Sequence, residues 1–229
     1  TEGMTIRTNR TVARFFPRSG RAVAVLEPTA AESGVGAEEI EVDAVLLAAG
    51  RTPNIEKLNL EAAGVRFNRR GVEVNAHLQT SQPHIFAGGD IAGGLQFTHL
   101  ADHHARIIVE NIIRSMVAPL RWFGLLAKAD TRVLPWATYT GPEVARVGLN
   151  ETEAKKAALE HDIFRVSLEH VDRYILERET EGFVKVVAAK KTGAILGATI
   201  VGESAGELIH EFALAMKNKI PLGTIASTI

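Results

Sequence analysis

The chain of 229 residues contains no cysteine, so it can form no disulfide and holds no redox-active cysteine pair. It also lacks any run of eighteen apolar residues, the length that would predict a transmembrane helix. Its charges balance, with 26 basic and 27 acidic residues, and no basic block indicates binding to nucleic acid or to a membrane surface. No charged head followed by an apolar core opens the sequence, so we expect a soluble, cytoplasmic, globular protein.

Two further motifs are missing, one typical of nucleotide binding and one typical of hydrolases. The nearest match to a Gly-x-Gly-x-x-Gly phosphate loop, residues 34–36, lacks the third glycine, the preceding strand and the following helix. We therefore predict a flexible loop there. No Gly-x-Ser-x-Gly elbow supports hydrolase chemistry. The aromatic residues that could stack on nucleic-acid bases are too scattered to form a platform: Trp122, Trp136, Tyr139 and Tyr174.

The most informative segment present is residues 80–90, Thr-Ser-Gln-Pro-His-Ile-Phe-Ala-Gly-Gly-Asp. Its apolar residues predict a short strand at 85–87, followed by two glycines that would let a bulky ligand approach the backbone. Asp90 would then lie at the carboxyl end of that strand, where open α/β sheets place their ligands. Its carboxylate could accept hydrogen bonds from ligand hydroxyls. The alternative is a strand that ends in a glycine turn, with Asp90 capping the next segment.

Two flanking segments strengthen the ligand interpretation. Residues 42–54 read Val-Asp-Ala-Val-Leu-Leu-Ala-Ala-Gly-Arg-Thr-Pro-Asn, and residues 95–105 read Leu-Gln-Phe-Thr-His-Leu-Ala-Asp-His-His-Ala. Together the three segments resemble the second half of the FAD-dependent pyridine nucleotide–disulfide oxidoreductases, which include dihydrolipoamide dehydrogenase, glutathione reductase and mercuric reductase. Residues 48–54 resemble the exit from the family's nicotinamide-nucleotide domain, and residues 80–90 are similar to its second FAD motif. The resemblance extends over nearly the whole chain.

The resemblance implies an α/β plus α+β fold, in which partial FAD- and NAD(P)-binding Rossmann-like domains precede an α+β dimerisation domain. Residues 1–48 would be the C-terminal part of the NAD(P)-binding domain, and residues 49–118 the C-terminal part of the FAD-binding domain. Residues 119–132 would form a linker. Residues 133–229 would form the dimerisation domain, truncated at its C-terminus.

Sequence patterns predict the elements of the first half. Alternating polar and apolar residues predict an antiparallel meander with strands at 11–16, 21–26 and 42–48, the last of them buried and broken at Gly50. A helix is predicted to follow Thr98 as its N-cap. Its apolar face would comprise Leu100, Ala101, Ala105, Ile108 and Ile112.

In the second half, Asn150 and Glu153 have the spacing of a capping box and predict a helix after residue 150. Ser204 and Glu207 predict a second capped helix, ending before Pro221. The apolar residues of this second helix are spaced by four: Leu208, Phe212 and Met216. Strands are predicted at 132–140, 145–149, 183–189 and 194–201, the last two forming a hairpin.

By resemblance, the start of the helix at residue 98 binds the flavin. A helix N-terminus carries roughly half a positive charge and free backbone N–H groups, which would stabilise the negative charge of a reduced flavin at its pyrimidine end. The backbone of Gln96, Phe97, Thr98 and His99 would do this, while Asp90 binds the ribityl chain of FAD. The family commonly has Leu-Ala-His where this chain has Phe-Thr-His, a difference that favours the mercuric-reductase-like members.

Other candidate residues have competing explanations. Gly50 lies, by resemblance, close to the nicotinamide nucleotide of NAD(P), or it is needed only to break the strand. His99 and His103 have the spacing of a shared metal site, but they lack a third convergent ligand, and we predict no metal. His210 beside Glu211 is expected to be a polar helix flank at a subunit interface. No catalytic residue is assigned.

The sequence thus predicts a fragment of a homodimeric flavoprotein that moves electrons from NAD(P)H through FAD to a disulfide, dithiol-linked or metal-ion acceptor. By resemblance, the cysteine pair, the phosphate loops and the acid–base histidine lie outside these residues, so the fragment alone is expected to be inactive. The alternative is a non-catalytic interaction module that dimerises through residues 133–229 and binds no flavin. Neither hypothesis includes nucleic acid or a membrane as a partner.

Overall fold

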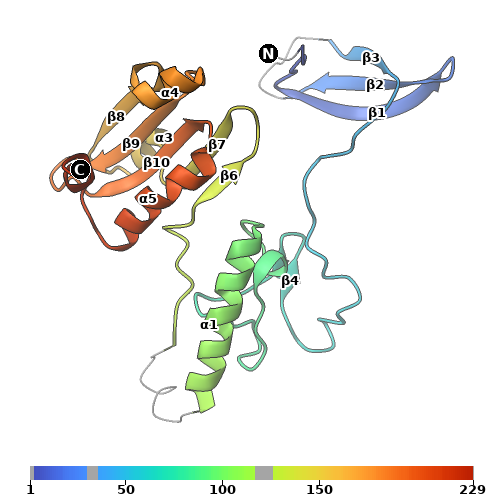
Figure 1. Cartoon of the computed structure of the whole chain (residues 1–229). Helices are drawn as coiled ribbons and strands as arrows, with labels where there is room; N and C mark the ends of the chain where they lie inside the picture. The colour runs from blue at the N-terminus through green and yellow to red at the C-terminus, as the bar shows by residue number, and fades with distance from the viewer. Residues whose placement is uncertain (1–2, 30–35, 117–125, 229) are drawn as a thin grey trace. The chain divides into compact units, whose positions relative to one another are not determined.

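The computed structural model describes residues 3–29, 36–116 and 126–228. The chain divides into two compact units, residues 1–51 and residues 52–229 (Figure 1). Three features predicted from the sequence lie wholly or partly outside the described residues: the loop at 34–36, the linker at 119–132 and Trp122.

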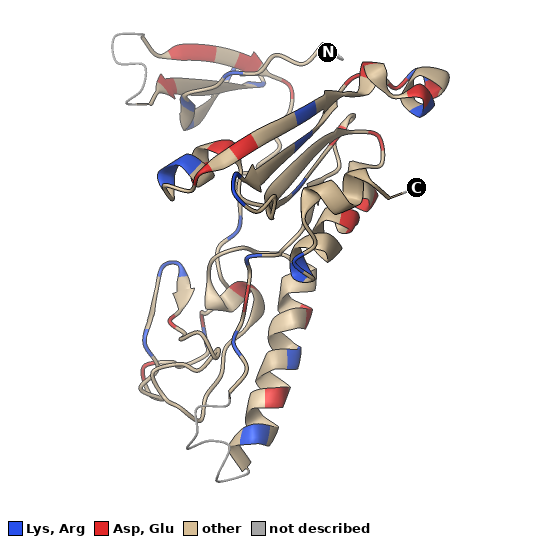
Figure 2. Ribbon diagram, turned by 90° about the vertical axis from the view of Figure 1, so that its left-hand side faces the viewer, with Lys and Arg blue, Asp and Glu red and all other residues tan. Residues whose placement is uncertain are grey.

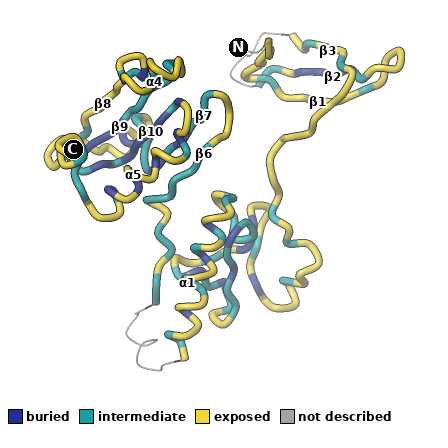
Figure 3. Tube along the Cα trace, viewed as in Figure 1, coloured by how far each residue is buried: buried dark blue, intermediate teal, exposed yellow. Residues whose placement is uncertain are grey.

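The first unit is an antiparallel meander, as predicted. Its strands run in the order β1-β2-β3, comprising β1 (Arg10–Arg18), β2 (Arg21–Pro28) and β3 (Glu38–Val42). The central strand β2 carries the buried residues 23–26 (Figure 3). A central strand loses exposure because a neighbour pairs with each of its edges, whereas β1 and β3 each have one partner.

The prediction of a buried strand at 42–48 is wrong. Pairing with β2 ends at Val42, opposite Ala22. Beyond it, Leu46 and Leu47 are 89% and 81% exposed. An apolar run becomes a buried strand only where a neighbouring strand takes its backbone hydrogen bonds and a second layer covers its side chains. Among the described residues of this unit, no strand lies beside residues 43–50.

The second unit opens with loops around a small core of Val65, Val72 and Ala87. It contains a two-stranded hairpin and a 3-10 helix: β4 (Phe67–Asn68), β5 (Gly71–Val72) and η2 (Gly89–Ala92). The predicted strand at 85–87 is reduced to one isolated bridge between Gln79 and Phe86. The amide of Ile85 donates instead to the carbonyl of Gln82 over 2.8 Å, and this local turn removes it from any longer ladder.

Helix α1 (Thr98–Met116) forms where the sequence predicts it. Thr98 is its first residue rather than its cap, because the carbonyl of Phe97 already accepts from the amide of Ala101 over 3.0 Å. The predicted apolar face is wrong in part: Ala105 is exposed and Ile112 is 43% exposed. The buried face instead comprises Leu100, His104, Ile107 and Asn111.

The exposed side of α1 carries both signs of charge in alternation (Figure 2). Asp102 pairs with Arg106, and Glu110 pairs with Arg114, each one helical turn apart. Such pairs stabilise a solvated helix face by only a few tenths of a kcal/mol, roughly 0.3–0.5 each. Within the described ranges, no helix is long and apolar enough to span a membrane.

The rest of the second unit is a five-stranded antiparallel sheet in the order β6-β7-β10-β9-β8. Its strands are β6 (Trp136–Thr138), β7 (Glu143–Gly148), β8 (His161–Ser167), β9 (Phe183–Ala189) and β10 (Ile195–Gly202). Helix α5 (Ala205–Lys217) packs on one face of the sheet, against β7 and β10 (Figure 1). Its Ile209 joins Val147 and Ile200 in the core between the two layers.

The predicted hairpin of β9 and β10 is confirmed, while β8 was not predicted. Shorter helices complete the unit: α3 (Glu151–Lys156), η3 (Leu168–His170), α4 (Asp172–Glu177) and α6 (Leu222–Ala226). Strand β8 pairs only with β9, and most of its residues are exposed. An edge strand that covers little core has a weak hydrophobic pattern, which is why the sequence did not reveal it.

The structure confirms one of the two predicted helix caps and contradicts the other. The capping box of Asn150 and Glu153 is confirmed: each side chain accepts a hydrogen bond from the other residue's backbone N–H, over 2.8 and 3.0 Å. The cap at Ser204 is wrong, because this residue has φ +58° and its side chain makes no capping bond. The amide of Gly206 donates instead to Oε2 of Glu143, from β7, over 2.9 Å. A carboxylate there suits the positive end of the helix.

The apolar face predicted for α5 is also wrong in part. Leu208 is 42% exposed, whereas Phe212 and Met216 pack against the edge of the core. The residues that enter the core are mostly small: Ala205, Ile209, Ala213 and Ala215. Small side chains allow the helix to approach the sheet closely, so the largest apolar residues do not mark the contact face.

We expect Asn150→Ala to lower the free energy of unfolding by about 1 kcal/mol, because it leaves the amide of Glu153 without its capping acceptor. Urea denaturation measures this effect. Thr152→Ala is the matched control, since Thr152 is an exposed residue of the same short helix; we expect a change of no more than about 0.5 kcal/mol. Equal losses in the two variants would contradict the capping role.

Candidate functional site

Two glycines place Asp90 against helix α1. A Cβ on Gly88 would lie 2.9 Å from Cδ1 of Ile108, and a Cβ on Gly89 would lie 3.0 Å from Cβ of Ala101. Gly89 also has φ +69°, which disfavours other residues. The glycines are therefore needed for the close approach of a helix, and their role in admitting a ligand stays a prediction.

This packing brings Asp90 beside the start of α1. Asp90 is half-buried in the first turn of η2, next to the glycine that touches Ala101. Gln96 and Phe97 are half-buried, while Thr98 and His99 are exposed. The structure thus brings these five site residues predicted from the sequence into one region. The first amides of a helix lack acceptors within the helix, and here the first two residues of the helix, Thr98 and His99, are exposed.

An aromatic stack connects this region to the C-terminal sheet. The ring of Phe97 stacks on His99, with 5.4 Å between centroids, and on Trp136 of β6, with 6.5 Å between centroids. The interplanar angles are 19° and 11°. Stacked rings at such distances contribute roughly 0.5–1.5 kcal/mol per pair beyond their burial. The segment that leads into α1 is therefore held against the sheet.

Two buried polar residues of α1 were missed by the sequence reasoning. His104 is 6% exposed, and its Nδ1 accepts a hydrogen bond from the Gly89 amide over 3.0 Å. Burial lowers the pKa of His104, and neighbouring His103 lowers it further. Asn111 is completely buried. Both lie on the helical stripe of Leu100 and Ile107, and a polar residue in phase with an apolar stripe is the signal that would have revealed them.

Asn111 ties the segment after α1 back onto the helix. Its Nδ2 donates to the backbone carbonyls of His77 and Ala127 over 3.0 and 2.9 Å. Its Oδ1 accepts from the amide of Ala127 over 2.7 Å. The His77 ring also bonds to the Ala127 carbonyl, over 3.0 Å. Residue 127 lies in the predicted linker, so this part of the linker is bound to helix α1.

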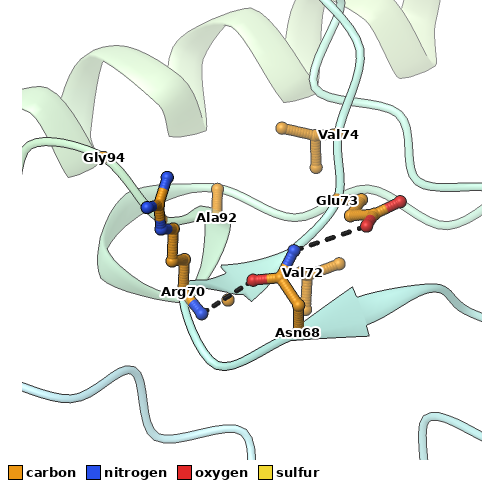
Figure 4. Close-up of a pocket in the computed structure, with 9 residues that line it drawn as sticks. Asn68, Arg70, Val72, Glu73, Val74, Ala92 and Gly94 are labelled. Atoms are coloured by element: carbon orange, nitrogen blue, oxygen red, sulfur yellow. Dashed lines mark hydrogen bonds between the residues drawn. The ribbon is translucent and has the colours of Figure 1, made fainter.

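The hairpin β4–β5 supports the other end of η2. A Cβ on Gly71 would collide with the carbonyl oxygen of Ile91, and one on Gly93 would lie 2.5 Å from the carbonyl oxygen of Arg70. Beside this contact is an open cavity of about 280 Å³. Asn68 shapes its rim by accepting from the Arg70 amide, over 2.7 Å, and donating to Glu73, over 3.4 Å (Figure 4).

A second cavity, of about 370 Å³, lies between the first turns of α1 and the end of α5. Its titratable lining residues are His99, His103, Asp130 and Lys217. Hydrogen bonds from Arg132 lower the pKa of Asp130 to about 2, so this carboxylate is ionised at neutral pH. Among the described residues, no group of three or more His, Asp or Glu side chains is arranged to hold a metal ion.

Gly50 belongs to the first unit, and the other predicted site residues belong to the second. It is exposed and has φ +106°, and a Cβ there would meet no atom within 4 Å. The backbone conformation alone is sufficient reason for glycine at this position. Contact with the nicotinamide nucleotide stays a prediction.

Comparison with protein families covers both units. Residues 1–105 match the pyridine nucleotide-disulphide oxidoreductase family, and residues 134–229 match the dimerisation domain of the same family. The chain belongs to the pyridine nucleotide-disulphide oxidoreductases. The resemblance inferred from residues 80–90 and their flanks is thereby confirmed, as is the α/β plus α+β fold class.

Relatives of this oxidoreductase chain include both kinds of enzyme that the sequence suggested. It is 38% identical to a mercuric reductase of Lysinibacillus sphaericus, over 84% of this chain and 34% of that protein. It is 35% identical to a dihydrolipoyl dehydrogenase of Thermus scotoductus, over 100% of this chain and 47% of that protein. The chain therefore spans less than half the length of these relatives.

Solved structures of the family share the fold. LpdA from Mycobacterium tuberculosis matches with a TM-score of 0.80 at 22% identity, over 100% of this chain and 46% of that chain. The HOCl-induced flavoprotein disulfide reductase RclA from Escherichia coli matches with a TM-score of 0.75 at 25% identity, over 96% of this chain and 47% of that chain. Again, less than half of each neighbour is covered.

Proposed function

We propose that these residues are part of an NAD(P)H-dependent flavoprotein oxidoreductase whose electrons pass through FAD to a disulfide, dithiol-linked or metal-ion acceptor. The packing of the Asp90 turn against the first turn of α1 is the observation that carries this proposal. It puts a half-buried carboxylate beside an accessible helix N-terminus. FAD, when bound, supplies the two-electron redox chemistry that no side chain of this cysteine-free chain provides.

Each site residue has a role in binding. The Asp90 carboxylate accepts hydrogen bonds from the ribityl hydroxyls of FAD. The backbone of Gln96, Phe97, Thr98 and His99 stabilises negative charge at the pyrimidine end of the ring, because the helix N-terminus carries partial positive charge. Backbone contacts of this kind are insensitive to side-chain identity, so the Phe-Thr-His sequence is compatible with the role. Gly50 lies near the nicotinamide nucleotide in this proposal.

A homodimer that assembles through residues 133–229 is the second part of the proposal. The match of residues 134–229 to the family's dimerisation domain supports it. A cytoplasmic location stays a prediction. The competing function is a dimerising module that binds no flavin.

The flavin proposal is tested with the protein at its natural length, purified from its source cell. We expect its absorption spectrum to show bound flavin. Asp90→Ala should raise the dissociation constant for FAD roughly 100-fold, because hydrogen bonds to a charged group contribute about 1.5–3 kcal/mol each. Fluorescence titration of the flavin-free protein measures this change.

Asp102→Ala is the control, since Asp102 is an exposed carboxylate on the adjoining helix; it should leave FAD binding unchanged. If unmodified protein binds no flavin, the oxidoreductase proposal is wrong and the dimerising module takes its place. If flavin binds equally well to the Asp90 variant, only the role of Asp90 is refuted.

A further inference from the structure

The turn before Asp90 is held by a histidine from another element. The backbone N–H of Gly89 donates to Nδ1 of His104 over 3.0 Å. Gly89 is the first residue of η2, and Gly88 at its N-cap offers no side chain to accept from the first amides. Those amides have no acceptor within the helix. The buried His104 ring therefore supplies the acceptor that a capping side chain usually provides.

This hydrogen bond determines the protonation state of His104. A ring nitrogen accepts a hydrogen bond only when it carries no proton, so the single proton of the neutral ring is on Nε2. Burial and the adjacent His103 both lower the pKa of His104, which favours this neutral form at pH 7. His103 is the charged neighbour on its own helix that lowers this pKa, and Asp90 is the titratable residue of η2, the element packed against α1.

We propose that His104 is a positioning residue of the flavin site, whose neutral ring holds the turn at residues 88–90 in the shape that presents the Asp90 carboxylate to FAD. His104 acts through the Gly89 amide rather than by contact with the flavin. The inference rests on the proposed function, because it concerns the same site. It adds a residue that sequence motifs do not identify, since His104 lies fourteen positions beyond Asp90, on the buried side of α1.

The proposal has a consequence for pH dependence. A protonated imidazole donates from both nitrogens, so it would oppose the Gly89 N–H instead of accepting from it. FAD affinity is therefore expected to fall as the pH decreases through the lowered pKa of His104, which lies below 6.5, the ordinary pKa of histidine. The free energy of unfolding changes in the same direction. Between the lowered pKa of His104 and pH 6.5, the unfolded chain binds more protons than the folded chain, so acid favours unfolding.

Three variants of the natural-length protein test the inference at pH 8. His104→Leu removes the acceptor while filling much of the same volume, and His104→Asn returns an acceptor oxygen close to the position of Nδ1. His103→Leu is the matched control, an adjacent histidine on the same helix without a bond to Gly89. For each, amide hydrogen exchange of Gly89 is followed by nuclear magnetic resonance in the flavin-free protein, and the dissociation constant for FAD is measured by titration.

We expect His104→Leu to abolish protection of the Gly89 amide and to raise the dissociation constant for FAD roughly 10- to 100-fold, the range for a buried donor left without a partner. His104→Asn should recover most of both properties, and His103→Leu should leave both unchanged at pH 8. The wild type should lose affinity as the pH falls through the lowered pKa of His104, whereas His104→Asn should not show this loss.

Two results would overturn the inference alone. One is a Gly89 amide that stays protected in His104→Leu, and the other is a loss of protection without any change in FAD affinity. In both cases the wild type still binds FAD, so the proposed function stands. A wild type that binds no FAD refutes the proposed function and this inference with it, and it is recognised from the unmodified sample.

Discussion

Asn111→Leu is expected to lower the free energy of unfolding of the second unit by about 3 kcal/mol, since each buried polar group left unpaired costs roughly 1–3 kcal/mol. The asparagine side chain satisfies three backbone groups, namely the carbonyls of His77 and Ala127 and the amide of Ala127. Leucine fits the space approximately but pairs with none of them. Because Asn111 is fully buried, water cannot take its place without opening the structure.

Urea denaturation followed by circular dichroism measures this effect, with the denaturant slope as a check that the transition itself is unchanged. Asn218→Leu is the control, because Asn218 is exposed and its side chain donates to the carbonyl of Leu214. Its loss should stay below about 1 kcal/mol. Similar losses in the two variants would show that the buried hydrogen bonds of Asn111 contribute nothing beyond those of a surface amide.

Gly182→Ala is expected to destabilise the C-terminal sheet by about 4 kcal/mol, combining overpacking with a strained backbone. Gly182 directly precedes β9 and has φ +143°, a conformation that an L-residue with a Cβ rarely adopts. The added Cβ would collide with the carbonyl oxygen of Val201 on β10 and lie 2.9 Å from Cδ1 of Leu168. Neither strand can move away freely, because β9 and β10 are paired with each other and with β8 and β7.

The same substitution at Gly223 provides the control. Gly223 lies in α6, does not have a positive φ, and would present its Cβ to open space. Alanine there should raise stability by up to about 1 kcal/mol, since it reduces the entropy of the unfolded chain and favours helix. Thermal denaturation compares the two variants. If Gly182→Ala melts at the wild-type temperature, close packing of Gly182 against β10 is not required by the fold.

How far the sequence could predict the fold depends on how local each signal is. The hairpin of β9 and β10 and the capping box at Asn150 were predicted correctly because the residues that determine them are neighbours in the chain. The segment 42–48 was predicted wrongly because burial of a strand depends on partners distant in sequence. The cap of α5 was missed for the same reason, since Glu143 lies 63 residues before Gly206.

In the candidate site, too, local features were predicted from the sequence and contacts between distant residues were not. Residues 80–90 and their flanks were sufficient to recognise the family, which the comparisons confirm. The roles of Asp90 and of residues 96–99 stay predictions. The contact of the glycines before Asp90 with helix α1 was not predicted, because only the structure brings residues 88 and 89 against it. The burial of His104 and Asn111 was not predicted, since polar residues on a helix are usually assigned to its exposed side.

The sequence by itself determined the family, the fold class and the position of most elements, because glycine turns, caps and apolar periodicity act over a few residues. It also determined that this chain contains no cysteine chemistry. Only the tertiary structure decided which side of α1 is buried and which side chains hold the turn at Asp90. A buried polar group is stable only where its hydrogen-bond partners converge, and for His104 and Asn111 those partners lie 15 to 34 residues away along the chain.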